Sequence, residues 1–187
     1  MVNIIRYIVA GIILIVTLCS LWSNWGTTQA NKQVDEANAA SQAANVLVSE
    51  FVPKYKELFT EANLQGFPGN REQLKPIVIE GRETLTKAAE QFRLAATKLE
   101  EAAARPVAKP LSEYWGLKVK AYRKLAESKE KFIKVVELFL DESNTTLDVL
   151  DGKLGPLIEE ATKLNTESDA FDAEAKKIQE ANPKEFK

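Results

Sequence analysis

The chain has 187 residues and a formal net charge of −2, with 25 basic and 27 acidic side chains, no histidine, one cysteine and one methionine. Zinc and haem sites, histidine-dependent nucleophilic triads and the Glu-x-x-His diiron sites of helical bundles need residues that this composition lacks or places in the N-terminal segment. The sequence also has no phosphate-binding glycine loop and no basic run interleaved with aromatic residues, so it predicts a protein that is not an enzyme, holds no cofactor or metal, and binds no nucleic acid.

The first predicted element is a membrane anchor. Residues 7–25 carry no charged side chain and consist mainly of Ile, Leu, Val and small residues. A helix needs roughly 20 apolar residues to cross the hydrocarbon core. Tyr7 lies at one edge of this stretch and Trp22 and Trp25 at the other, as expected of rings at the two membrane interfaces. We therefore predict a transmembrane signal anchor over residues 1–26.

The orientation of the anchor follows from its short N-terminal flank. Arg6 and the α-amino group are positive, and positive charge beside a span is retained in the cytoplasm. Residues 27–187 are then extracytoplasmic, on a single-pass protein of the bacterial cell membrane with a periplasmic domain. The alternative is a cleaved secretory signal with its cut before Asn31, which would release a secreted domain.

The rest of the chain predicts four helices. Apolar residues recur at alternating spacings of three and four, which is typical of helices that pack side by side at a shallow angle. Gly152 is expected just after the third helix and Pro156 in the first turn of the fourth, because glycine and proline favour these positions. The predicted helices cover about residues 30–64, 71–104, 111–150 and 156–181.

The fold class predicted from these elements is all-α. Short connections between long helices make antiparallel neighbours. The N-terminal transmembrane helix is therefore expected to be followed by an extracytoplasmic up-down-up-down antiparallel four-helix bundle of the coiled-coil type. Alanines narrow the predicted core and phenylalanines fill its wider layers; the phenylalanines are Phe51, Phe92, Phe132, Phe139 and Phe171.

Two surfaces are candidates for binding a protein partner. Phe67 lies in the turn after the first predicted helix, at the end far from the membrane, although a turn aromatic can instead fold back over the core. Tyr122, Val136 and Leu140 lie off the main apolar stripe of the third predicted helix and form a second apolar face. An exposed face of this kind would mark an interaction surface.

A contact with the membrane surface is expected at the opposite end of the bundle. Arg105, Lys109, Tyr114 and Trp115 combine basic and aromatic side chains close to the predicted bilayer, which suits anionic headgroups. The alternative is that the charges only balance their own helix faces, since exposed ion pairs contribute little.

One segment of the sequence has a family resemblance. Residues 34–53, VDEANAASQAANVLVSEFVP, resemble the opening helix of LemA-type bundles, which likewise follows an N-terminal span. The segment from Val34 to Ala37 and Pro53 carry the resemblance, and the later helices show no pattern of that family.

The function expected from these features is binding rather than catalysis. We expect a membrane-anchored helical bundle that acts as an envelope adaptor, scaffold or accessory subunit through contact with another protein. The alternative is an extracytoplasmic sensor or a bundle that binds a small ligand. A sensor normally needs a second span and a cytoplasmic output, and the sequence up to Lys187 shows neither.

Overall fold

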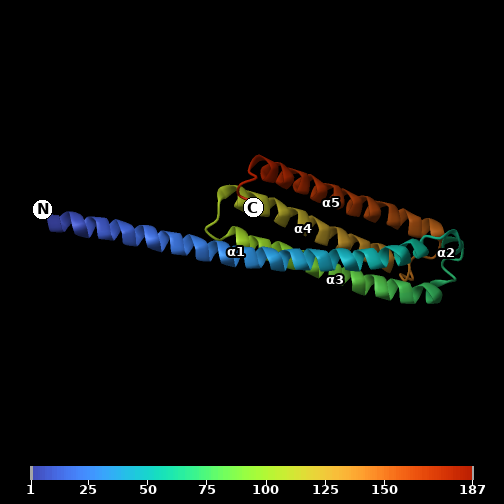
Figure 1. Cartoon of the computed structure of the whole chain (residues 1–187). Helices are drawn as coiled ribbons and strands as arrows, with labels where there is room; N and C mark the ends of the chain where they lie inside the picture. The colour runs from blue at the N-terminus through green and yellow to red at the C-terminus, as the bar shows by residue number, and fades with distance from the viewer. Residues whose placement is uncertain (1, 187) are drawn as a thin grey trace.

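The computed structural model describes the backbone of residues 2–186 and the side chains of residues 28–186, and over this range it contains helices and no strand. The four long helices lie side by side, and consecutive ones run in opposite directions (Figure 1). The protein is therefore all-α with bundle-like packing, as predicted. The helices are α1 (Val2–Leu58), the short α2 (Glu61–Gln65), α3 (Arg71–Ala103), α4 (Lys109–Glu137) and α5 (Leu147–Ala181).

The N-terminal part of α1 extends beyond the other helices (Figure 1). The predicted anchor at residues 7–25 belongs to this extension and lies outside the described side chains. Among the residues that were described in full, no helix is both long and apolar enough to cross a membrane. The α3–α4 connection and the C-terminal end lie on the side from which α1 extends, and α2 lies at the far end (Figure 1).

The predicted break at residues 151–156 is wrong. The chain leaves α4 after Glu137 and enters α5 at Leu147, so Gly152 and Pro156 lie inside α5. Proline is unfavourable in a helix interior because it lacks an N–H donor, and this rule suggested a helix start at Pro156. The observed start is capped instead by Thr146, whose side chain accepts a hydrogen bond from the Val149 N–H at 3.3 Å.

Contacts from another part of the chain stabilise the connection at residues 138–146. The buried Asn144 donates its side-chain amide to the Leu138 carbonyl at 2.7 Å. Arg71, in the first turn of α3, donates to the Asp141 carbonyl at 3.0 Å and also to the Asn144 carbonyl. These bonds supply side-chain donors to three backbone carbonyls of the connection, of which that of Asp141 also accepts from the Asn144 N–H at 3.0 Å. The connection is therefore bound to the first turn of α3 by a residue that lies seventy positions before Asp141 in the sequence.

The first predicted helix, 30–64, also ends early. Helix α1 stops at Leu58, and α2 is a separate short helix whose N-cap Thr60 accepts a hydrogen bond from the Asn63 N–H at 3.4 Å. The second predicted helix, 71–104, agrees with α3 to within a residue.

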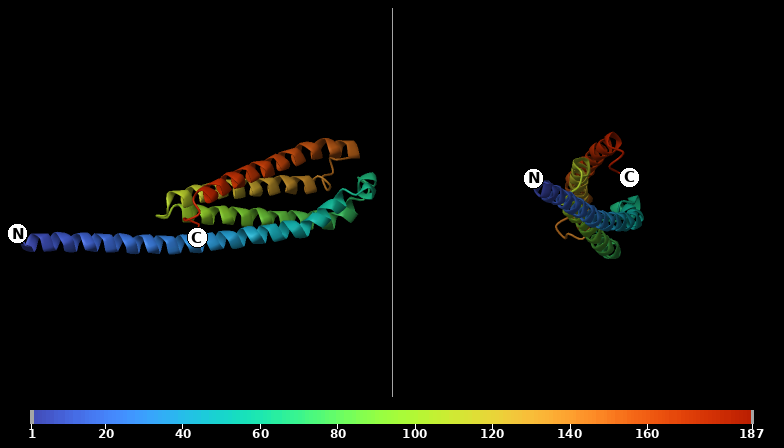
Figure 2. Two further views of the ribbon diagram at one scale, coloured as in Figure 1. Left: turned by 45° about the horizontal axis from the view of Figure 1, so that its top comes forward. Right: turned by 60° about the vertical axis from the view of Figure 1, so that its left-hand side comes forward.

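Helices α1 and α5 form the edges of the array (Figure 2, left view). Helix α1 packs on α3, α3 on α4 and α4 on α5, and no comparable backbone packing joins α1 to α5 over the described residues 2–186. A closed four-helix bundle would also pair its first and last helices. The helices therefore form an open array rather than the closed bundle expected from the sequence.

The width of each helix's apolar face explains this order. An edge helix needs to cover one neighbour, whereas a central helix must cover two. On both edge helices buried side chains recur every seven residues and form a seam. The seam consists of Ala30, Ala37, Ala44, Phe51 and Leu58 on α1, beside which Ala40 and Ser41 are also buried, and of Leu154, Ala161, Ser168 and Ala175 on α5, which Leu150 precedes.

The central helices bury wider faces. On α3 adjacent positions are buried together, as at Ala88 and Ala89, and α4 does the same at Ala121 and Tyr122. The α5 seam is small enough for a close approach, and the buried Ser128 of α4 donates to the Ala161 carbonyl of α5 at 3.1 Å.

The core divides into two apolar clusters along the array. The cluster nearer the α1 extension is rich in alanine, and Phe92 and Trp115 are its largest members on α3 and α4. The cluster at the far end is rich in large side chains, such as Phe51, Leu58 and Phe139. Alanine lets helices approach closely, whereas phenylalanine holds them apart. The separation of the helices therefore changes at the junction between the two clusters.

Candidate functional site: an apolar pocket with a buried lysine

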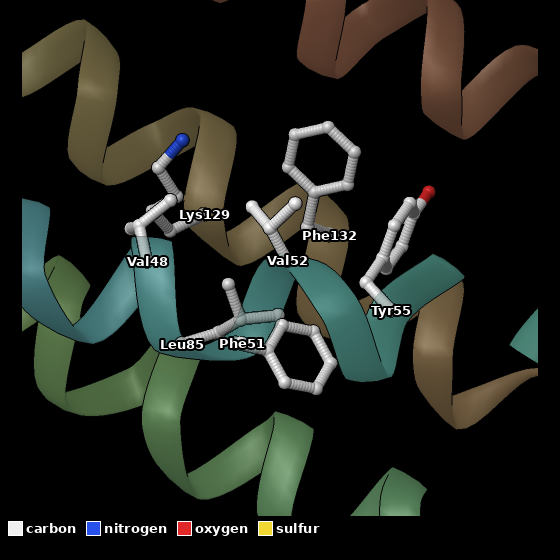
Figure 3. Close-up of a pocket in the computed structure, with 7 residues that line it drawn as sticks. All are labelled: Val48, Phe51, Val52, Tyr55, Leu85, Lys129 and Phe132. Atoms are coloured by element: carbon white, nitrogen blue, oxygen red, sulfur yellow. The ribbon is translucent and has the colours of Figure 1, made fainter. Parts of the chain in front are cut away.

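A cavity of about 200 Å³ lies at this junction, between α1, α3 and α4 (Figure 3). Its deeper wall is formed by buried side chains, and its rim is open, since Val52 is 41% exposed. All of its lining side chains are hydrocarbon except for one ammonium and one phenol group. The lining residues are Val48, Phe51, Val52 and Tyr55 of α1, Leu85 of α3, and Lys129 and Phe132 of α4.

Gly81 allows Phe51 to form part of the pocket wall. A Cβ atom at position 81 would lie 2.4 Å from Cζ and 2.6 Å from Cε2 of the Phe51 ring, which is closer than carbon atoms can approach. The ring therefore rests directly on the backbone of α3. Gly81 and Phe51 are both buried, so this contact fixes the separation of α1 and α3 next to the cavity.

Lys129 lies on α4 at a position where the seven-residue recurrence of buried side chains predicts an apolar residue. Trp115, Tyr122 and Val136 are buried and lie at seven-residue intervals, and Lys129 is the position between Tyr122 and Val136. Only 8% of Lys129 is exposed. Lysine is almost never buried to this extent without a partner.

The other buried or half-buried lysines of α4 have partners of opposite charge on α5. Lys118 contacts Asp172 at 2.8 Å, Lys124 contacts Glu167 at 3.0 Å, and Lys131 pairs with Glu160. Lys129 has no carboxylate within 4.0 Å of its Nζ atom among residues 28–186. Its Nζ lies 5.5 Å from the centre of the Phe132 ring. Burial therefore lowers the pKa of Lys129 below its ordinary value, with no opposing ion pair.

Aromatic rings close the other side of the pocket. The ring of Tyr55 meets Phe132 edge to face, with centroids 5.6 Å apart, and it also contacts Phe59 at 4.9 Å. In the view of Figure 3, Phe132 lies between Lys129 and Tyr55. Burial raises the pKa of Tyr55 to about 12, so its hydroxyl stays protonated at neutral pH and can donate a hydrogen bond.

This arrangement is suited to binding. A dry cavity of about 150 Å³ lined by aliphatic and aromatic side chains is large enough to hold benzene, and this cavity is somewhat larger. It has the usual character of a small-molecule site, with apolar walls and few polar groups. Over residues 28–186 no group of three or more His, Cys, Asp or Glu side chains could hold a metal ion.

The predicted partner-binding residues lie mostly in the core. Phe67 is buried, with its ring 6.2 Å from Phe139 and under the guanidinium of Arg71, so it folds back over the end of the core. Tyr122 and Val136 are also buried, and Leu140 is half-buried against the far-end cluster. The second apolar face of α4 is therefore not an exposed surface, because α4 is a central helix with neighbours on two sides.

The predicted membrane-surface residues lie together around the α3–α4 connection, at the end from which α1 extends (Figure 1). Arg105 is half-buried, and Lys109 is exposed and pairs with Glu113 at 3.4 Å. Tyr114 packs edge to face on Phe186, with centroids 5.0 Å apart. Trp115 is buried in the alanine-rich cluster, so its ring is part of the core rather than of a membrane-facing surface.

The sequence interpretation did not single out Lys129. The signal was present, because Tyr122 and Val136 were identified as one apolar face and Lys129 lies seven residues from each. A charged residue in the middle of an apolar stripe is a candidate functional residue whenever its partner is missing. That its partner is missing could be established only from the packed structure.

Comparison with known proteins gives no match to a protein-family model, a curated protein or a solved structure.

Proposed function

We propose that the protein is a non-catalytic, membrane-anchored binding protein whose extracytoplasmic helices hold a small apolar ligand in the pocket between α1, α3 and α4. The observation that carries this proposal is the cavity of about 200 Å³ with its almost entirely hydrocarbon lining. An open apolar cavity exposes hydrophobic surface to water, and covering it with a ligand recovers that free energy.

The anchor and location remain part of the proposal. The uncharged stretch at residues 7–25 and the positive flank at Arg6 support a membrane span with the N-terminus in the cytoplasm. Helix α1 runs without a break from Val2 to Leu58, so a span at its start would be rigidly joined to the pocket residues. The pocket would then lie well above the bilayer, since α1 rises about 1.5 Å per residue.

Small-ligand binding is favoured over the adaptor function by the burial of the residues expected to contact a partner. Phe67, Tyr122 and Val136 are all in the core. The adaptor function remains the second proposal, and it is supported by exposed valines on the two edge helices, Val46 on α1 and Val149 on α5. A photo-reactive amino acid at Val46 of the full chain in cells should then give one discrete cross-linked product, and a diffuse pattern would count against an adaptor.

The ligand proposal can be tested by methyl NMR of the full chain in phosphatidylcholine nanodiscs. Octan-1-ol is the neutral probe, and we expect it to shift the methyl resonances of Val48, Val52 and Leu85 but not those of Leu94, which lies outside the pocket lining. Such shifts report the site itself and not partition of the probe into lipid.

A single substitution at the rim is expected to fill the cavity. Val52→Trp places a larger side chain at the exposed rim, where it can be accommodated without repacking the core. It should abolish the octan-1-ol shifts while preserving the helical spectrum. Octan-1-ol shifts that persist at Val48 in this variant, or that are absent in the unsubstituted protein, would refute the proposal.

A further inference from the structure

Lys129 is a buried residue, 8% exposed, for whose ammonium group the described part of the protein supplies no counter-charge. Moving an ammonium out of water is unfavourable unless it is paired and hydrogen-bonded. The lysines that line the α4–α5 contact meet this requirement through Asp172, Glu167 and Glu160, and Lys129 does not. The residue that faces its Nζ is Phe132, and the other titratable group lining the cavity is Tyr55.

We propose that the pocket is a carboxylate site: it takes a small amphipathic monocarboxylate whose anionic end pairs with Lys129 and whose apolar tail lies against Phe51, Leu85 and Phe132. This inference rests on the proposed function and adds the chemical class of the ligand. An anion at Lys129 replaces the lost hydration of the ammonium with a charge-assisted hydrogen bond. The apolar tail covers the hydrocarbon wall that the open rim leaves in contact with water.

The number of donors favours a monocarboxylate over a phosphate. A phosphate carries more negative charge and three strong acceptor oxygens, and it is usually bound by several donors. This pocket offers one ammonium and one phenol, and its remaining lining is hydrocarbon. One positive charge matches one carboxylate.

The size of the cavity favours a free small molecule over a lipid. A volume of about 200 Å³ is filled by one ring or by a short alkyl chain. Longer tails would pass the exposed Val52 at the rim and leave the pocket. We therefore take octanoate as the probe, with octan-1-ol as the neutral molecule of the same chain length.

The test compares the two probes by methyl NMR titration of the full chain in phosphatidylcholine nanodiscs, read at Val48, Val52 and Leu85. We expect octanoate to bind at least about tenfold more tightly than octan-1-ol, the lower range of a hydrogen bond to a charged group. Lys129→Met should remove this preference, so that octanoate binds no more tightly than octan-1-ol. Lys129→Arg retains the charge and should keep part of the preference.

A second α4 lysine is the matched control. Lys134 is exposed and is not part of the pocket lining, so Lys134→Met makes the same chemical change outside the site and should leave the preference unchanged. A loss of preference in Lys134→Met equal to that in Lys129→Met would show that overall charge, and not Lys129, selects the anion, and would overturn the proposal.

The outcomes separate this inference from the proposed function. Equal affinities for octanoate and octan-1-ol in the unsubstituted protein would overturn the carboxylate assignment while the apolar pocket stands. Shifts with neither probe would overturn both. A lipid occupant is tested by replacing phosphatidylcholine with phosphatidylglycerol in the nanodisc: shifts of the Val48 and Val52 methyls without added octanoate would assign the site to a lipid headgroup and overturn the proposal of a free carboxylate.

Discussion

Gly81→Ala tests the contact that holds α1 and α3 together beside the pocket. The added Cβ atom would lie 2.4 Å from Cζ of Phe51, about 1 Å inside normal van der Waals contact. The Phe51 ring is buried, so it can move only by displacing its neighbours or by entering the cavity that it lines. The substitution therefore overpacks the α1–α3 contact.

Two effects of opposite sign set the magnitude. Alanine is more favourable than glycine in a helix interior by up to about 1 kcal/mol, whereas overpacking a core typically costs about 1–3 kcal/mol. We expect Gly81→Ala to lower the free energy of unfolding by about 1 kcal/mol. In a Phe51→Leu background the clashing ring atoms are absent, so the same change should raise the free energy of unfolding by about 0.5–1 kcal/mol.

The assay is urea unfolding of the full chain in detergent micelles, followed by far-UV circular dichroism and arranged as a double-mutant cycle. Gly116→Ala on α4 is the matched control, because a Cβ atom there would meet nothing within 4 Å. It should stabilise both backgrounds by about 0.5–1 kcal/mol. If Gly81→Ala stabilises the protein as much as Gly116→Ala does, the close contact with Phe51 is absent and the reasoning fails.

Four further substitutions test other parts of the structure. Phe92→Ala should lower the free energy of unfolding by about 3–5 kcal/mol, because Phe92 is 1% exposed. Phe132→Ala should lower it by less, because Phe132 is half-buried at the open pocket. Equal losses of the two variants in urea unfolding would contradict this expectation. Lys129→Met should raise thermal stability at neutral pH, since burial disfavours the charged form of Lys129 in the folded state and so lowers its pKa. This gain should shrink as the pH rises towards 10.5, the ordinary lysine value, and melting curves with a pH-independent difference would disprove it. Arg71→Leu should lower the free energy of unfolding by about 1–3 kcal/mol and accelerate amide hydrogen exchange over residues 138–146, because it removes the hydrogen bonds from Arg71 to two carbonyls there. Unchanged protection of these amides would show that the Arg71 hydrogen bonds do not stabilise the connection.

Much of the fold could be predicted from the sequence because helix periodicity is local. The apolar spacing predicts the α3 helix almost to the residue, since its wide alanine-rich face and its flanking turns lie within one segment. The seven-residue seams of α1 and α5 are also visible in the sequence, from Ala30 to Leu58 and from Leu154 to Ala175.

The third helix break could not be predicted in this way. Gly152 and Pro156 are strong local signals for a break, yet both lie within α5. At the observed break Arg71, from the first turn of the neighbouring helix α3, donates to the Asp141 and Asn144 carbonyls. A hydrogen bond between residues so far apart leaves no periodic trace in the sequence.

The sequence by itself determined that the protein is all-helical, that its residues lack the side chains for histidine-based catalysis, and which helix faces are apolar, because composition and periodicity are properties of the chain. Only the tertiary structure decided that Phe67 covers the core and that Lys129 lies in an apolar pocket without a counter-charge. The physical reason is that burial and pairing depend on neighbours from other helices. The pocket around Lys129 is lined by hydrocarbon side chains, among them Phe51 and Val52 of α1 and Leu85 of α3. Lys118 and Lys124 of α4 instead contact carboxylates of α5.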